Sequence, residues 1–503
     1  DGTFAMVRLV LFGAALATLA FVFFEGLGAW GWVVGGGLMA GFFIAAILNE
    51  PVRDAMATEK RSSMVTERLL ARLRRDWDTL DWKSTRKKLN TVQLAEHQKD
   101  VAEDLDLLGK SSLFQFVSMA GTTIGVRTLA SWLTGVADAE VARGRSEAVQ
   151  RLAPRRDERL RFYSLARHVG EGTGDPDEFI RWSQSESWLD GNAWLLSWAR
   201  LSLVLSVISI VALIIFRIGL APTVVGQISL AVLVAIVVLN VVITTLMLGP
   251  VHQIFSIAMA SRESVDEYRE LFSAARWLEE EDDERPTASR LDHLHTVLLD
   301  DPLQSAQVGM GALKRVAAMG ALRSSASTFL LYLPLQAFAL WDIRVLQKLE
   351  NWQRSYRDSV PGWFDAFGEL EALMSLAAVC DENPTWTFPL WCDDTAEESG
   401  TAEFRSLGLG HPLIGDEDRV CNDVTIGPAG TVLLVTGSNM SGKSTMLRSV
   451  GLNVSLAGAG APVCATQLSL PSTELATSIR VRDNLAEGVS FYMAELKRLK
   501  GVV

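Results

Sequence analysis

Cysteine and histidine are both scarce in this chain. Its 503 residues include four cysteines and six histidines, and neither type recurs at the spacing of metal ligands or of a disulfide framework. This argues against a zinc site and against a small extracellular domain held together by disulfides, and it fits a reducing compartment.

Positive charge is also in short supply. Lys and Arg number 47 against 59 Asp and Glu, so the formal net charge is −12. A chain with this balance has no overall basic surface for nucleic acid. The basic run from Lys83 to Lys88 is a local exception. It could contact anionic lipid or nucleic acid, or it could form a solvated helix face.

What the chain does contain is long apolar runs. Four of them carry almost no charge and pair into two hairpins: Leu9–Phe24, Ala29–Leu48, Leu201–Phe216 and Thr223–Leu248. A bilayer core needs roughly 20 apolar residues per helix, with about 17 as the lower end. The second and fourth runs meet this length, and the first and third reach it if Arg8 and Arg200 snorkel. The pattern predicts two transmembrane hairpins. The alternatives are four buried core helices, or a signal peptide for the first run.

The Lys and Arg residues beside these runs predict an orientation. Seven basic residues lie between Arg53 and Arg75, after the second run, whereas the first hairpin turn has none and the second has only Arg217. Both turns are therefore expected outside the cytoplasm. We expect a multi-pass protein of a bacterial-type inner (cytoplasmic) membrane, with all large segments in the cytoplasm.

Residues 437–444 form a complete G-x-x-x-x-G-K-[ST] phosphate loop. The apolar run Val432–Val435 precedes the loop and a helix-compatible segment follows it, which is the strand–loop–helix context of this motif. Lys443 is expected to reach the β- and γ-phosphates of ATP, and Ser444 to ligate Mg²⁺. The alternative is a chance glycine-rich turn. The predicted nucleotide-binding residues of the loop are Gly437, Ser438, Asn439, Met440, Ser441, Gly442, Lys443, Ser444 and Thr445.

The loop and its flanks, Thr436–Arg448, read T-G-S-N-M-S-G-K-S-T-M-L-R. This resembles the phosphate loop of the MutS family of mismatch-repair ATPases, T-G-P-N-M-x-G-K-S-T-x-x-R, and departs from it at Ser438. Other segments also resemble that family: Gly109–Phe114, Thr122–Leu129, Arg143–Val149, Phe367–Leu373, Gly410–Leu413, Asn422–Asp423 and Asp483–Glu495.

The resemblance implies roles for three further residues. His411 lies in the segment similar to the family's R-H-P, ahead of the nucleotide site. Arg419 stands where family members often stack an aromatic residue on adenine, so it could stack on the base or be a solvated surface residue. Ser490 could contact a γ-phosphate across a homodimer interface, or it could cap a helix that starts at Phe491.

The departures from the family pattern concern DNA and hydrolysis. Phe23–Glu25 matches the family's F-x-E wedge by chance inside an apolar hairpin, and Leu201–Leu248 stands where the family inserts its DNA clamp. DNA is thus a possible partner, but without a recognisable mismatch or clamp domain. The chain ends at Val503, before the family's Walker B carboxylates, so ATP hydrolysis is expected only of a longer protein.

Together these features predict a mixed fold. Transmembrane α-helical hairpins and an all-α lever or core domain are followed by an α/β P-loop NTPase domain of the ABC-ATPase-like type, incomplete at its C-terminus. The predicted segments are an N-terminal transmembrane hairpin (1–50), an amphipathic helical linker (51–103), a first part of the MutS-like helical core (104–198), a second transmembrane hairpin (199–250), lever and core helices (251–382), a linker (383–403) and the P-loop domain (404–503).

The predicted function is that of a membrane-anchored MutS-like ATP-binding protein. Its nucleotide cycle would rearrange the lever helices and the membrane hairpins. The alternative is a membrane-tethered DNA-binding ATPase related to mismatch repair.

Overall fold

The computed structural model of this chain resolves into two compact units, Asp1–Leu70 and Ala71–Val503, which are described separately below. The structure describes residues 29–80, 82–135, 138–172, 176–259, 262–273, 289–323, 329–392, 401–438 and 441–479, with Lys500 and scattered positions among the first 21.

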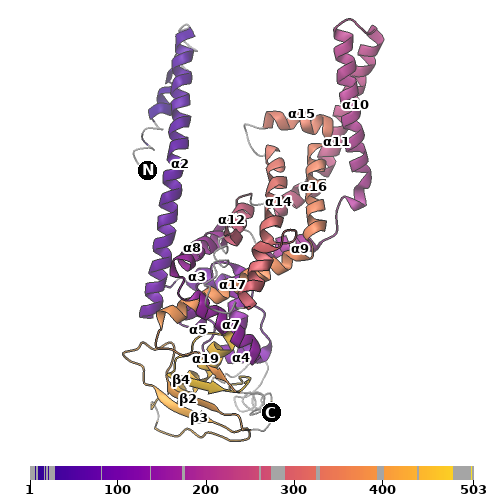
Figure 1. The fold of residues 1–503 in the computed structure, drawn as a ribbon. Helices are drawn as coiled ribbons and strands as arrows, with labels where there is room; N and C mark the ends of the chain where they lie inside the picture. Colours follow the sequence, from indigo (N-terminus) through magenta and orange to yellow (C-terminus); the bar gives the residue numbers. More distant parts are fainter. Residues whose placement is uncertain are drawn as a thin grey trace, which may run out of the picture. The chain divides into compact units, whose positions relative to one another are not determined.

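Helices dominate the second unit (Figure 1). Its helical elements are α3 (Trp82–Leu89), α4 (Glu96–Asp104), α5 (Leu113–Val117), α6 (Thr123–Thr134), α7 (Ala139–Leu152), α8 (Arg156–Gly172), α9 (Pro176–Gln184), η1 (Asp190–Asn192), α10 (Ala193–Arg217), α11 (Thr223–Met259), α12 (Arg262–Ser273), α13 (Ser289–His295), η3 (Thr296–Asp300), α14 (Ala306–Gly320), η4 (Ala321–Arg323), α15 (Phe329–Ala339), α16 (Trp341–Tyr356), α17 (Ser359–Glu382) and α19 (Lys443–Ala459).

The first unit consists mainly of one long helix. Helix α2 (Ala29–Arg74) is continuous for 46 residues, so the apolar run Ala29–Leu48 passes without a break into the charged segment that follows it. The last four residues of α2 belong to the second unit. The preceding apolar run, Leu9–Phe24, is described only in part, and its described residues (10–15, 17, 18 and 21) are helical.

The prediction of transmembrane hairpins needs correction. Two helices of the described residues, Asp190–Arg217 and Thr223–Met247, are long and apolar enough to cross a membrane by length and composition. The sequence predicted four such segments in two hairpins, and the described residues offer one pair of candidates, in α10 and α11. Length and composition are weak criteria, because a buried core helix of a soluble protein also satisfies them.

The prediction of an α/β P-loop NTPase domain is wrong. In the described part of residues 383–479 the structure has only a small mixed sheet, in the order β1-β4-β2-β3. Strand β2 is antiparallel to β3 and β4, and β1 is parallel to β4. The strands are β1 (Leu390–Trp391), β2 (Phe404–Leu409), β3 (Asn422–Ile426) and β4 (Gln467–Leu470).

The error begins at the apolar run ahead of the phosphate loop. Val432–Val435 was expected to be a buried central strand, but it forms no strand, and Val432 and Leu434 are 89% and 80% exposed. A central parallel strand needs hydrogen-bonding neighbours on both edges and cover on both faces. No described segment provides them, so the run stays outside the sheet and mostly exposed.

The core of the second unit is built around α17. This helix is buried along most of its length, and it packs against α6 and α7. The carboxylate of Glu371, on α17, is fully buried and accepts hydrogen bonds from the N–H groups of Gly121 and Thr122 and from the hydroxyl of Thr122. Burial raises the pKa of Glu371. Because Thr122 also caps α6, this carboxylate fixes the start of the helix on which α19 packs.

Candidate nucleotide-binding site

The phosphate loop leads directly into α19. Gly442 has φ = +85° and precedes the first helical residue, Lys443. This left-handed conformation suits glycine, so the second glycine of the motif is where the chain turns into the helix. The ammonium of Lys443 donates to the carbonyl oxygens of Gly437 and Ser438, at 2.8 and 2.5 Å. Asn439 and Met440 lie outside the described residues.

The start of α19 is suited to an anion. Gly442 offers no side chain to cap the helix, and no side-chain hydrogen bond caps it. The exposed Ser444 and Thr445 lie in the first turn, beside the Lys443 ammonium. Helix N-terminal N–H groups together with a cation favour bound phosphate. A phosphate group at this position would compete with the loop carbonyls for Lys443.

Helix α19 is anchored at its far side by a buried amide. The amide nitrogen of Asn453 donates to the carbonyl of Gly410 at 3.0 Å, and its oxygen accepts from the N–H of Cys464 at 2.6 Å. Nearer the loop, Arg448 forms an ion pair with Asp106 of the helical core at 3.2 Å. These contacts fix the orientation of α19 against the end of β2 and against the helical core.

His411 lies next to this anchor. Its Nδ1 accepts a hydrogen bond from the N–H of Leu413 at 3.3 Å. Burial and the nearby charges of Arg448 and Arg419 lower the pKa of His411 to about 4. The ring is therefore neutral near pH 7. No contact of the described residues joins His411 to the phosphate loop, so its predicted nucleotide role stays a prediction.

Arg419 is engaged within its own loop. Its guanidinium donates to the carbonyls of His411 and Ile414, at 3.1 and 2.6 Å, and pairs with Asp416 at 2.8 Å. It lies 5.7 Å from the ring centre of Trp386, and its side chain is 8% exposed. Stacking on a nucleotide base would require these contacts to break. The predicted Ser490, with the segment Asp483–Glu495, lies outside the described residues.

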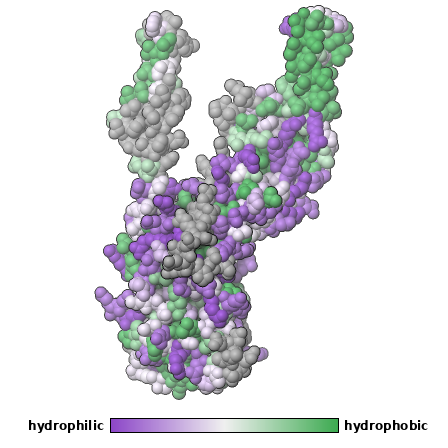
Figure 2. Space-filling view, viewed as in Figure 1, coloured by the Kyte–Doolittle hydropathy of each residue, from purple (hydrophilic) through white to green (hydrophobic). Residues whose placement is uncertain are grey.

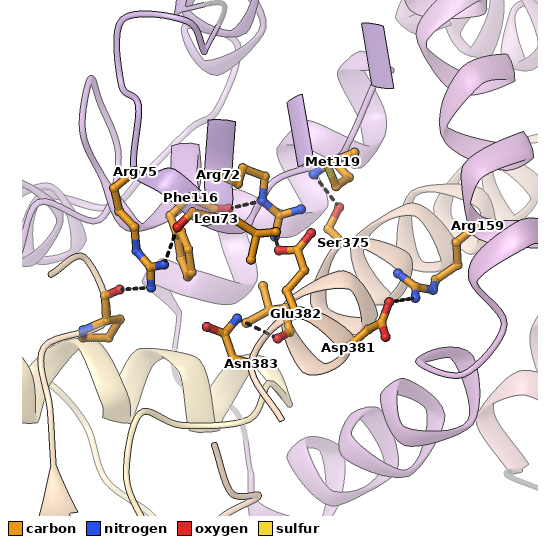
Figure 3. A network of polar contacts seen from close by, with 12 residues as sticks. Arg72, Leu73, Arg75, Phe116, Met119, Arg159, Ser375, Asp381, Glu382 and Asn383 are labelled. Carbon is orange, nitrogen blue, oxygen red and sulfur yellow. Dashed lines mark hydrogen bonds and ion pairs between the residues drawn. The ribbon is translucent and has the colours of Figure 1, made fainter. Parts of the chain in front are cut away.

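Figure 3 shows a polar network that the sequence did not reveal. It is formed by Arg72 and Arg75 and their distant partners. Arg72, fully buried at the end of α2, donates to the carbonyl of Phe116 at 2.6 Å and pairs with Glu382 of α17 at 3.2 Å. Arg75 donates to the carbonyl of Pro412 at 3.3 Å, and its guanidinium lies 4.8 Å from the Phe116 ring centre.

This network connects the end of α2 to the nucleotide side of the unit. Arg75 holds Pro412, two residues from the Gly410 carbonyl that Asn453 of α19 binds. In the sequence Arg72 and Arg75 look only like charges that flank an apolar run. Their partners are about 40 to 340 positions away in the chain, so no local pattern could have identified them.

The partly buried imidazole of His411 is expected to make stability pH-dependent. An unfolded histidine has a pKa of about 6.5, whereas that of His411 is lowered to about 4. As the pH falls through this window the unfolded state takes up a proton first, so stability is lost below about pH 6.5. We expect His411→Asn to reduce the fall in melting temperature between pH 7 and pH 5. His97→Asn, which removes an exposed histidine, is the control. An unchanged pH profile in His411→Asn would contradict the burial argument.

Comparison with known proteins shows that parts of this chain are similar to mismatch-repair proteins. Residues 433–503 match the family model of MutS domain V. The chain is 29% identical over 153 residues to the DNA mismatch repair protein MutS of Streptococcus equi subsp. equi (strain 4047), which covers 30% of this chain and 18% of that protein. It is 33% identical over 162 residues to the DNA mismatch repair protein MSH6 of Arabidopsis thaliana, covering 30% of this chain and 12% of that protein.

The matched segment includes Lys443 and the helix that it begins, so this part of the chain is similar to MutS domain V. The resemblance drawn from the phosphate loop and its flanks is thereby confirmed. The chain spans less than a fifth of the length of these relatives.

Proposed function

We propose that this chain is a membrane-anchored, MutS-like ATP-binding protein. ATP at the phosphate loop changes the arrangement of the helical core, and the α10–α11 hairpin anchors that core in a membrane. The hairpin lies in a bacterial-type inner membrane, and the loop faces the cytoplasm.

The observation that carries the membrane part is the inverted polarity of the hairpin. In α10 the buried face includes Ser202 and Ser206, at 0% and 1% exposure. The outward face carries residues such as Val204 and Ile208, at 53% and 58%. Water favours the opposite arrangement, with the small polar residues outside. The face of the hairpin seen in Figure 2 is mostly hydrophobic over its upper part.

The polar groups inside the hairpin find protein partners. The indole N–H of Trp198 donates to Asn240 at 2.8 Å, and the Asn240 amide donates to the carbonyl of Ala337 at 2.8 Å. Gln336 of α15 donates to the hydroxyl of Thr244 at 2.9 Å. In a hydrocarbon environment there is no water to bind polar groups, so these groups must form hydrogen bonds within the protein. Hydrogen bonds between helices are stabilising there. The arrangement supports a hairpin surrounded by lipid.

The nucleotide part rests on the family and on the chemistry of the loop. The uncapped start of α19 and the Lys443 ammonium suit a polyphosphate. The Ser444 hydroxyl, in the first turn, is the group that would hold Mg²⁺, and the ion would neutralise charge on the β- and γ-phosphate oxygens. The relatives are mismatch-repair proteins by name, and we infer the same nucleotide class, ATP, for this chain.

The network behind the loop supports coupling between nucleotide and helices. Phosphate that draws Lys443 away from the loop carbonyls would shift the start of α19. Asn453 and Gly410 connect α19 to Pro412, and Arg75 connects Pro412 to the end of α2. Arg72 then reaches Glu382 at the end of α17. This continuous series of contacts is the route by which we propose that nucleotide binding reaches the helical core.

Hydrogen exchange tests this function directly. The chain is reconstituted in lipid nanodiscs and compared with and without a non-hydrolysable ATP analogue. We expect slower amide exchange in the first turns of α19, at 410–412 and at the end of α2, with the hairpin amides protected throughout. Exchange that is identical with and without the analogue would contradict the nucleotide coupling. Rapid exchange along α10 and α11 would contradict the anchor.

Duplex binding separates this proposal from its alternative. The names of the relatives favour a membrane-tethered DNA-binding ATPase as the second candidate. Salt-dependent binding of duplex DNA to the reconstituted chain would support that candidate.

We further propose a homodimer, since nucleotide modules of the family meet face to face. Mass measurement in detergent should give a dimer that tightens with the ATP analogue, and Ser490→Ala should weaken the tightening.

A further inference from the structure

Two arginines lie together at the base of the hairpin. Arg344 of α16 donates to the carbonyl of Ala199 at 2.8 Å and to that of Ala339 at 3.0 Å. These bonds hold its guanidinium beside the exposed Arg200, the residue after Ala199 in α10. Burial and the charge of Arg200 both lower the pKa of Arg344. Among the described residues neither guanidinium forms an ion pair with a carboxylate, so the pair presents uncompensated positive charge.

The position of Arg200 along α10 matches a membrane boundary. Arg217, at the hairpin tip, is 17 positions after Arg200 in the chain. At 1.5 Å per residue this corresponds to about 26 Å, close to the roughly 30 Å of a hydrocarbon core. No charged residue lies between the two arginines. If the hairpin spans a bilayer, Arg200 is at one headgroup layer and Arg217 is at the other.

Helix α15 lies at the same level. Its C-terminal end meets the hairpin, and the rest of this apolar helix, Phe329–Ala339, extends to one side (Figure 1). The carbonyl of Phe338 accepts from Ser206 of α10 at 3.4 Å, and that of Ala337 accepts from Asn240 of α11. Leu333 of α15 and Trp194 of α10 are exposed. Tryptophan and apolar side chains beside arginine are typical of the membrane interface.

We propose that this collar, made of Trp194, Arg200, Arg344 and α15, binds the phosphate of anionic phospholipid headgroups. The inference rests on the proposed membrane anchor and deepens it by naming the lipid class. Paired guanidiniums suit phosphate oxygens by charge and by hydrogen-bonding geometry. A zwitterionic headgroup brings its own cation and gains less from them. The collar therefore ties the N-terminal end of α16, and with it the helical core, to the charge of the membrane surface.

Spin-labelled lipids provide the test. The whole chain is reconstituted in phosphatidylcholine vesicles that contain a trace of spin-labelled phosphatidylglycerol or spin-labelled phosphatidylcholine. Electron paramagnetic resonance then gives the fraction of each lipid that the protein immobilises. We expect about fivefold stronger association of phosphatidylglycerol, as expected for one interfacial basic residue at an anionic headgroup. The preference should fall as salt is raised.

Substitutions test whether Arg200 causes the preference for phosphatidylglycerol. Arg200→Gln should bring the ratio of the two lipids close to one, and Arg200→Lys should keep most of it. Arg143→Gln removes the same charge from an exposed site on α7 and should change nothing. Equal association of both lipids with the parent chain, or an unchanged ratio in Arg200→Gln, would overturn the collar. Failure to immobilise either lipid would instead contradict the membrane anchor itself.

Discussion

Val207→Lys is expected to abolish insertion of the hairpin. Val207 lies near the middle of α10, and half of its side chain is exposed. A lysine at the centre of a membrane helix costs about 3 kcal/mol on insertion scales, a factor of roughly 100. On the surface of a soluble protein the same change stays within about 0.5 kcal/mol. The substitution therefore discriminates between the two environments.

The readout for Val207→Lys is the position of the hairpin tip in cells. In an Ile218→Cys background, labelling by a membrane-impermeant thiol reagent should drop to background when Val207→Lys is added. Val420→Lys is the matched control, because Val420 is 77% exposed in a loop of the C-terminal region. It should leave labelling intact. Undiminished labelling in Val207→Lys would mean that lipid does not surround this face.

Lys443→Ala is expected to weaken nucleotide binding at least tenfold, about 1.4 kcal/mol. Lys443 contributes the ammonium at the predicted phosphate site, and in the structure it is held by the carbonyls of Gly437 and Ser438. Its loss removes positive charge from the start of α19 and leaves the β- and γ-phosphates to backbone groups alone.

A titration with fluorescent ATP measures this effect. Lys99→Ala is the control, since it removes an exposed lysine that pairs with Glu96 on α4. The control should bind ATP as the parent does. Equal affinities of the parent and Lys443→Ala would contradict the assignment of the phosphate loop.

Local sequence patterns predicted the local structure well. A helix was expected directly after the phosphate loop, and α19 begins two residues earlier than that, at Lys443. The third and fourth apolar runs correspond to α10 and α11. Thr122, at the start of a family-like segment, caps α6. In each case the residues that determine the structure are neighbours in the chain, so spacing alone is sufficient.

Features that depend on distant partners were missed. The run Val432–Val435 is apolar enough for a central strand, but a strand also needs neighbours, which local sequence does not specify. Likewise, Arg72 and Arg75 gain their roles from Phe116, Glu382 and Pro412. The inward orientation of Ser206 and Asn240 depends on how α15 packs against the hairpin, which hydropathy does not reveal.

The membrane hairpin is the central claim, and thiol labelling in intact cells tests it most directly. The chain has its own internal control in Cys421, an exposed cysteine on the nucleotide side of the protein. With Ile218→Cys at the tip between α10 and α11, an impermeant reagent should label the tip and leave Cys421 unlabelled until the cells are opened. Labelling of Cys421 in intact cells, or an unlabelled tip before and a labelled tip after the cells are opened, would contradict the account.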